Sequence, residues 1–431
     1  MKGGLNFEQT PPLQLPLRFF LSGSAFGILA GLLLAVSGDA LASRWTPQML
    51  ALTHAFTAGF MLQVMCGALL QVLPVAVGGG VPRPILTGGL VHAAITLGAA
   101  ALIGGFLSAE PTLYVLAGLL LAGGLVPMSM LGVIKLLRGG GARDVRQGLF
   151  LALAALFATV LIGAAMAWAR GGWATLQALS LHDLHARWGL AGWGLLLLAG
   201  TAYQVVPMFQ LTPAYPTWMR SWFAPALFAA LLAGMIPGVP GWLANLLAAA
   251  GTAVFALATL HVQRQRKRAR IDSTFRFWRT AMLIALAAAL MVALAPWVEL
   301  PQWEIAVGML IMHGGFGAVM IGMLYKIVPF LVWLHLSNQG CRAPLMNQII
   351  PEARMSRHFK IHLLSLGAAL ACLWFGALAP LAGLLVAGSY LMLGINLLQA
   401  LRCYRQSLGE AQPLRRRDRE GAINPRNRQA A

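Results

Sequence analysis

Long uninterrupted apolar segments dominate this chain of 431 residues and limit what it can fold into. Many of them reach the roughly 20 residues that an α-helix needs to cross a hydrocarbon layer of about 30 Å. Only 10% of the residues are charged, against roughly 25% in a soluble domain. The chain therefore has too few polar side chains to cover a water-facing surface. The sequence predicts an all-α polytopic membrane protein.

Apolar runs and helix breakers predict about twelve transmembrane helices. They are expected near residues 17–37, 47–75, 84–107, 112–137, 147–169, 184–210, 220–237, 240–262, 275–296, 303–334, 361–380 and 382–402. We expect residues 1–402 to form a single transmembrane domain. The polar, basic segment 409–431 is predicted to be a disordered cytoplasmic tail. The start of the chain, with Pro11 and Pro12, predicts no cleavable signal.

The formal net charge of +19 is distributed unevenly over the predicted topology. When the connections alternate between the two sides of the membrane, 28 of the 31 Lys and Arg residues fall on one side. This bias is typical of a bacterial-type inner-membrane protein with an even number of helices and both termini in the cytoplasm. The basic runs 264–270 and 415–419 are therefore interpreted as topology signals that contact anionic lipid. A nucleic-acid partner is not expected.

A short motif recurs three times and predicts internal repetition. Residues 67–74, 200–207 and 322–329 all fit G-x-x-x-[QK]-[VI]-x-P, and another Gly lies eight residues upstream in each case, at Gly59, Gly192 and Gly314. The three copies fall on the second, sixth and tenth predicted helices. This spacing predicts three tandem four-helix repeats, roughly 17–137, 147–262 and 275–402, arranged with pseudo-threefold symmetry. We expect the glycines to permit close approach between helices.

Histidines inside the predicted helices are the candidate functional residues, because an imidazole in hydrocarbon is costly and usually serves a function. His54 on the second helix and His313 on the tenth lie on repeat-related helices at a similar outer depth. Two neutral imidazoles so placed can clamp a haem iron. Met309 occupies the position on the tenth helix that matches His54, and His185 lies at the outer mouth of the sixth. Either side chain is an alternative second ligand.

Other polar and sulfur-containing residues carry less information. The four cysteines form no C-x-x-C pair, so neither a disulfide framework nor a zinc site is expected. No P-loop, G-x-S-x-G or H-E-x-x-H motif occurs. Three histidines that border the basic side are predicted to be interface residues: His261, His335 and His358.

The pattern of repeats and histidines resembles the catalytic subunit family of haem–copper oxidases and nitric oxide reductases. The chain is most similar to the compact NnrS-like branch, haem-containing membrane proteins linked to nitric oxide stress. The likeness is carried by residues 16–21, by His54 with the Gly-rich stretch to Pro74, and by residues 313–322. The resemblance implies that His54 and His313 correspond to the two axial ligands of a low-spin haem b.

Several residues of the oxidase pattern are missing from this chain. The second His of the tenth helix would stand two residues from His313, where Ile311 and Gly315 are found. The copper site requires a His pair in the seventh helix, yet residues 221–230 contain no His. At the inner copper-ligand position of the sixth helix, Arg187 replaces His. Copper is therefore not expected, and conventional oxygen or nitric oxide reduction is not expected either. If the chain is an enzyme, it is an oxidoreductase.

Two functional hypotheses follow from the sequence. The first is a haem b protein that transfers electrons or responds to nitric oxide, with a cytochrome or a quinone as its redox partner. The second is a membrane transporter or a soft-metal permease for copper, which the 19 methionines leave open. Methionines in apolar helices are more often packing residues than metal ligands.

Overall fold

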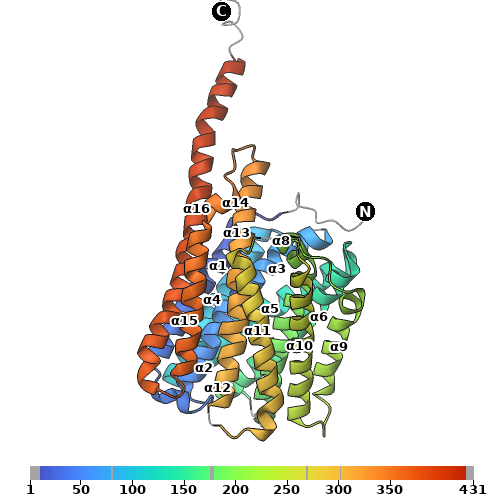
Figure 1. Cartoon of the computed structure of the whole chain (residues 1–431), viewed down its shortest axis with the longest axis vertical. Coiled ribbons are helices and arrows are strands. Elements are labelled where there is room, and N and C mark those ends of the chain that lie inside the picture. The colour runs from blue at the N-terminus through green and yellow to red at the C-terminus, as the bar shows by residue number, and fades with distance from the viewer. Residues whose placement is uncertain (1–9, 79–80, 175–178, 268–269, 301, 424–431) are drawn as a thin grey trace, which may run out of the picture.

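The computed structural model describes residues 10–78, 81–174, 179–267, 270–300 and 302–423, and these residues form no β-strand. Long helices run side by side in one bundle (Figure 1). In chain order the α-helices are α1 (Gln14–Ala35), α2 (Pro47–His54), α3 (Leu62–Val77), α4 (Pro84–Ser108), α5 (Pro111–Arg138), α6 (Arg143–Arg170), α7 (Leu179–Arg187), α8 (Leu196–Gln210), α9 (Thr217–Ala233), α10 (Gly241–Arg264), α11 (Ser273–Leu294), α12 (Trp303–Met309), α13 (Ala318–Asn338), α14 (Met346–Ile349), α15 (Glu352–Ala371) and α16 (Ala379–Ile423).

Within the described ranges, ten helical segments are long and apolar enough to cross a membrane. The prediction of an all-helical membrane protein is confirmed at this level. Twelve spans were expected, and α9 and α15 account for the difference. Helix α9 has only 17 residues, and the first half of α15 carries several charged side chains. Both helices nevertheless belong to the bundle.

Three of the membrane helices contain a π-helical segment near their middle. These segments are η3 (Ala55–Met61) between α2 and α3, η4 (Trp188–Leu195) between α7 and α8, and η6 (Leu310–Gly317) between α12 and α13. They fall on the three helices that carry the recurring motif, and each contains the upstream Gly of its motif. A π-helical turn is rare and is frequent at functional sites. The sequence analysis did not anticipate this shared distortion.

The motif glycines lie where two helices touch. A methyl group at Gly67 would lie 2.7 Å from Cβ of Phe19, one at Gly200 would lie 3.3 Å from Cα of Gly148, and one at Gly322 would lie 2.8 Å from Cβ of Phe277. In each case the neighbour belongs to the helix that precedes the motif helix, namely α1, α6 or α11. The prediction that these glycines permit close helix approach is confirmed.

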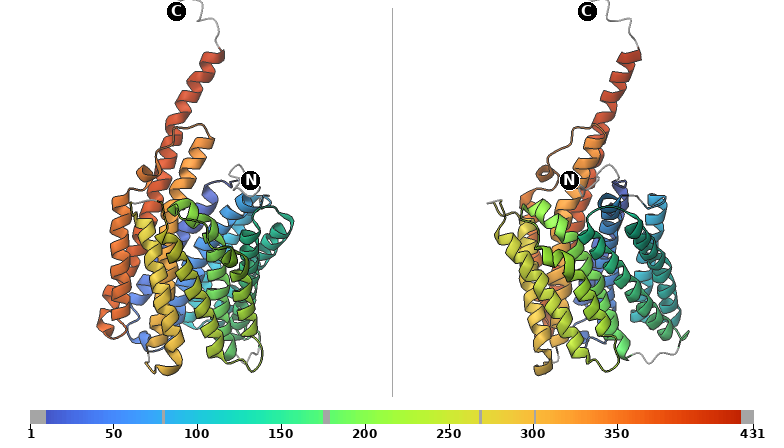
Figure 2. Two further views of the ribbon diagram at one scale, coloured as in Figure 1. Left: turned by 45° about the vertical axis from the view of Figure 1, so that its right-hand side comes forward. Right: turned by 90° about the vertical axis from the view of Figure 1, so that its right-hand side faces the viewer.

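Further contacts join successive groups of helices and the two ends of the chain. Helix α5 packs on α6, α10 packs on α11, and α16 packs on α1, so the last long helix lies beside the first (Figure 2). Helix α16 ends on the same side of the bundle as α14, whereas α2 and α12 lie at the opposite end (Figure 1). Below, the α2 end and the α14 end denote these two sides.

Two helices differ from their predicted bounds. Helix α15 begins at Glu352 and not near residue 361, because Pro351 precedes a helical start whose charged side chains conceal it from a hydropathy reading. Helix α16 continues to Ile423, through most of the segment that was predicted to be a disordered tail. Residues 424–431 lie outside the described part of the chain.

Candidate functional site

His54 and His185 form a facing pair near the α2 end of the bundle. Their ring centroids lie 6.5 Å apart and their planes are inclined by only 22°. His54 is the last residue of α2, directly before η3, and His185 lies on α7 just before η4. The two π-containing helices therefore bring together two of the sequence-predicted site residues.

Both imidazoles are oriented by main-chain carbonyl groups. Nδ1 of His54 lies 2.8 Å from the carbonyl oxygen of Leu50, and Nδ1 of His185 lies 3.1 Å from that of Thr159. A carbonyl oxygen only accepts, so each Nδ1 carries the proton and each Nε2 has a free lone pair. Neither Nε2 bonds to a described residue, and both atoms keep some accessible surface. Each imidazole thus keeps an Nε2 lone pair that no described residue uses.

A phenylalanine and a glycine pack closely against the pair. Phe106 of α4 packs on His54 with ring centroids 5.1 Å apart. Gly163 of α6 faces His185, and a methyl group there would lie 2.8 Å from Cε1 of the imidazole. Any side chain at Gly163 would therefore displace the His185 ring.

His182 adds an unsatisfied group to the same end. Both of its ring nitrogens are buried and have no hydrogen-bond partner among the described residues. Its ring packs edge-on against Trp45, with centroids 5.2 Å apart. A buried polar atom without a partner typically costs about 1–3 kcal/mol. A buried imidazole without a partner, close to two free Nε2 atoms, is typical of a site that binds another molecule.

Arg44 connects the N-terminal ends of the three π-containing helices through ion pairs. Its guanidinium lies 3.1 Å from Asp183 of α7 and 2.8 Å from Glu304 of α12, while Arg44 itself precedes α2. These side chains are between one third and two thirds exposed. Because exposed ion pairs add little stability, these pairs mainly fix the positions of the three helix ends relative to one another.

His313 lies in a separate buried group of polar residues. Its Nδ1 is 2.9 Å from the hydroxyl of Tyr390, and its Nε2 is 2.9 Å from Oγ of Ser365. Both nitrogens are thus occupied by protein partners. Among the described residues, His313 and His54 share no hydrogen bond or ring contact. The ring nearest to His313 is that of His362, with centroids 4.3 Å apart.

The group around His313 extends through a chain of hydrogen bonds between helices α13, α15 and α16. Asn396 donates to the Tyr325 hydroxyl, which is bonded to Nδ1 of His358. Nε2 of His358 lies 2.9 Å from Oγ of Ser389, and that atom lies 3.1 Å from Nδ1 of His362. All of these side chains are 3% exposed or less.

The donors in this chain take one consistent direction. Because Asn396 donates to Tyr325, the Tyr325 hydroxyl donates onward to His358, and His358 to Ser389. Ser389 then donates to His362, whose Nε2 keeps its hydrogen but is buried without a partner in the described structure. Every imidazole in the chain is neutral in this arrangement. A buried network of this kind fixes how three helices pack against one another.

This network was not predicted from the sequence. His358 was predicted to be an interface residue, yet it is fully buried. Because α15 begins at Glu352, His358 and His362 lie about two and three turns along the helix. The spacing of His358, His362 and Ser365 on one helical face was the available signal.

The other predicted site residues have simpler surroundings. Met309 ends α12 and is 8% exposed in the apolar core. The ring nitrogens of His335 face two carbonyl oxygens at the α14 end of the bundle, with Nδ1 2.8 Å from that of Leu331 and Nε2 3.0 Å from that of Pro11. His261 is exposed and bonds to Gln265.

The described residues include no group of three or more His, Cys, Asp or Glu side chains that could hold a metal ion. A metal that brings its own ligands needs fewer from the protein. A metal bound by two imidazole nitrogens at about 2 Å each separates the ring centres by roughly 6 Å, and those of His54 and His185 lie 6.5 Å apart. Two imidazoles with free Nε2 atoms supply the type of donor that a haem iron takes as a ligand.

The fold and its apolar helices define a multi-pass α-helical membrane protein. No protein-family model matches the chain, and no curated protein sequence matches it.

Proposed function

We propose that this protein binds one haem b between His54 and His185 and uses it to transfer electrons within the membrane. The observation that carries the proposal is the pair itself: two near-parallel imidazoles with ring centroids 6.5 Å apart and both Nε2 atoms free. His185 takes the place of His313 as the second ligand in this proposal, because both nitrogens of His313 already bond to protein side chains.

The surrounding residues would prepare the pair for this role. The carbonyl groups of Leu50 and Thr159 hold the Nδ1 protons, which fixes the tautomer and raises the basicity of Nε2. Phe106 and the apolar helices supply apolar surroundings for the pair. A haem held by His54 and His185 would supply a one-electron redox couple, and with both histidines bound it would have no position free for a gas. Electron transfer is therefore favoured over nitric oxide binding, with a cytochrome or a quinone as partner.

We also propose that the bundle consists of twelve membrane helices in three repeats of four. The repeats are α1 to α5, α6 to α10 and α11 to α16, with α2–α3, α7–α8 and α12–α13 each counted as one helix and α14 as a connection. The proposal is supported by the three π-helical segments and by the matching glycine contacts. The basic side of the bundle, where α16 ends, would face the cytoplasm of a bacterial-type cell.

A reduced-minus-oxidised spectrum of the purified protein tests the haem proposal directly. We expect the sharp bands of a low-spin haem b, together with a pyridine haemochrome that corresponds to one haem per chain. His54→Ala and His185→Ala should each remove a bond to iron and sharply lower the haem content. His335→Ala serves as the matched control, because His335 lies at the α14 end and should leave the haem content unchanged.

His313→Ala separates the two possible ligand pairs. We expect it to keep the haem and to lower stability, because Tyr390 and Ser365 lose their partner. Loss of haem in His313→Ala but not in His185→Ala would instead restore the His54–His313 pair. A folded protein that contains no iron would refute the proposal and favour the transporter hypothesis.

A further inference from the structure

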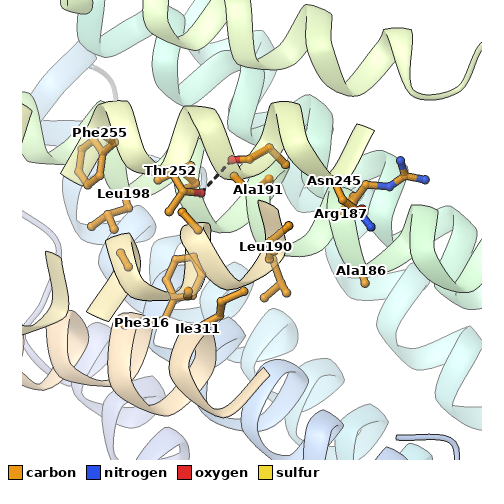
Figure 3. Close-up of a pocket in the computed structure, with 18 of the residues that line it drawn as sticks. Ala186, Arg187, Leu190, Ala191, Leu198, Asn245, Thr252, Phe255, Ile311 and Phe316 are labelled. Atoms are coloured by element: carbon orange, nitrogen blue, oxygen red, sulfur yellow. Dashed lines mark hydrogen bonds between the residues drawn. The ribbon is translucent and has the colours of Figure 1, made fainter. Parts of the chain in front are cut away.

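A second feature of the bundle is an elongated cavity of about 240 Å³ that the haem proposal does not use. It lies between α7, η4 and α8 on one side and α10, α11 and η6 on the other. Two of the three π-helical segments therefore form its walls (Figure 3). Neither His54 nor His185 lines it, and its described lining contains no His or Cys.

Small side chains create the space. Eight alanines and one glycine line the cavity, and the α11 wall alone presents Ala281, Ala285, Ala288 and Ala289. Larger apolar residues complete the wall, among them Phe255 and Phe316. The lining on α7 to α8 runs from Asp183 to Leu198, a length of roughly 22 Å at 1.5 Å per helical residue. The cavity thus has the shape and the polarity of a slot for a hydrocarbon chain.

One end of the cavity is polar and positively charged. Figure 3 shows Arg187 and Asn245 at one end, and Phe255 and Leu198 toward the other. The charged residues of the lining are Arg44, Asp183 and Arg187, which leaves one net positive charge. Asp183 forms its ion pair with Arg44. Arg187 meets only the main-chain carbonyl of Asp183, at 3.3 Å from its Nε.

The guanidinium of Arg187 forms no ion pair with a described carboxylate. No described carboxylate lies within ion-pair distance of it, and its Nη1 is buried beside Gly234 without a hydrogen bond. The side-chain amide of Asn245 also has no hydrogen-bond partner in the described structure. A guanidinium pairs best with a planar anion that accepts two parallel hydrogen bonds, which is the geometry of a carboxylate.

We propose that this cavity binds a long-chain carboxylate, with its headgroup at Arg187 and Asn245 and its hydrocarbon chain along the alanine-lined wall. The carboxylate supplies the ion pair that Arg187 does not form within the described structure, and the chain packs against the alanine-lined wall. The site is distinct from the haem site, so the two proposals succeed or fail separately.

Competition binding in nanodiscs of neutral lipid tests this site. The probe is cis-parinarate, a fluorescent long-chain carboxylate excited by energy transfer from the tryptophans. Two competitors with the same chain, dodecanoate and dodecanol, isolate the headgroup. Because a hydrogen bond to a charged group is worth about 1.5–3 kcal/mol, we expect dodecanoate to displace the probe at a concentration at least tenfold lower than dodecanol.

Two variants locate the site. Arg187→Gln should weaken dodecanoate about tenfold or more and leave dodecanol unchanged. Ala285→Trp should fill the slot and abolish probe binding, and Ala285→Leu replaces it if the larger side chain prevents folding. Arg170→Gln changes an arginine near the same end of the bundle that does not line the cavity, so its affinities should equal those of the wild type.

Three results would overturn the proposal. Equal affinity for dodecanol and dodecanoate would assign the slot to a neutral ligand such as a quinone. A tightly retained phospholipid, identified by mass spectrometry of the purified protein, would assign it to a structural lipid. Probe binding that survives both Arg187→Gln and Ala285→Trp would place the probe elsewhere.

Discussion

Gly31 of α1 and Gly383 of α16 face each other so closely that neither position has room for a methyl group. A Cβ at Gly31 would lie 2.7 Å from the carbonyl oxygen of Gly383, and a Cβ at Gly383 would collide with the main chain of Gly31 and Ala35. The obstacles are backbone atoms, which cannot rotate away as side chains do. This contact joins the first and last membrane helices and closes the bundle.

Gly383→Ala should therefore force α1 and α16 apart. We expect the free energy of unfolding to fall by about 1–3 kcal/mol, the usual cost of overpacking. Thermal unfolding in detergent measures the change. Gly388→Ala on the same helix is the control, because nothing lies within 4 Å of its added methyl group. Equal stability of the two variants would show that α1 and α16 do not touch here.

Gly163→Ala tests the wall beside His185. The added methyl group would lie 2.8 Å from the imidazole, so the ring must move and Nε2 must leave its proposed position opposite His54. We expect a lower haem content at unchanged expression, measured as the pyridine haemochrome. Gly123→Ala, on α5 with open space around it, should retain the wild-type haem content. Full haem content in Gly163→Ala would argue against His185 as a ligand.

Tyr390→Phe tests the buried network around His313. The change removes the hydroxyl that lies 2.9 Å from Nδ1 of His313 and leaves that nitrogen without a partner. We expect a loss of about 1–2 kcal/mol of stability, which lies within the range for an orphaned buried group. Tyr404→Phe is the control, because Tyr404 accepts a bond from Gln339 in an exposed position. A similar small effect in both variants would show that the network is not tightly packed.

Reporter fusions test the orientation of the bundle. A reporter joined after Arg270, in the basic connection before α11, should be cytoplasmic. One inserted near Glu299, between α11 and α12, should be exposed on the opposite side. The expectation rests on the uneven distribution of Lys and Arg over the connections. The reverse result at either point would mean that a helix does not cross the membrane.

The helices and the repeated glycines could be read from local patterns. Apolar runs locate the long helices because hydrocarbon admits only segments that satisfy their own backbone hydrogen bonds. The motif that includes Gly67, Gly200 and Gly322 predicted the helix contacts, because a glycine lets two helix backbones approach closely wherever they cross. The start of α15 was misplaced, since charged residues at a helix end resemble a loop in a hydropathy reading.

The composition and periodicity of this sequence by themselves determined that the chain is a helical membrane protein with three related motif helices. Only the tertiary structure decided which histidines meet. The sequence paired His54 with His313 by depth, but depth along a helix does not specify the direction in which a side chain points. The folded bundle brings His54 next to His185, with ring centroids 6.5 Å apart. Partners for His313 lie on α15 and α16, and long-range packing alone brings these helices to it.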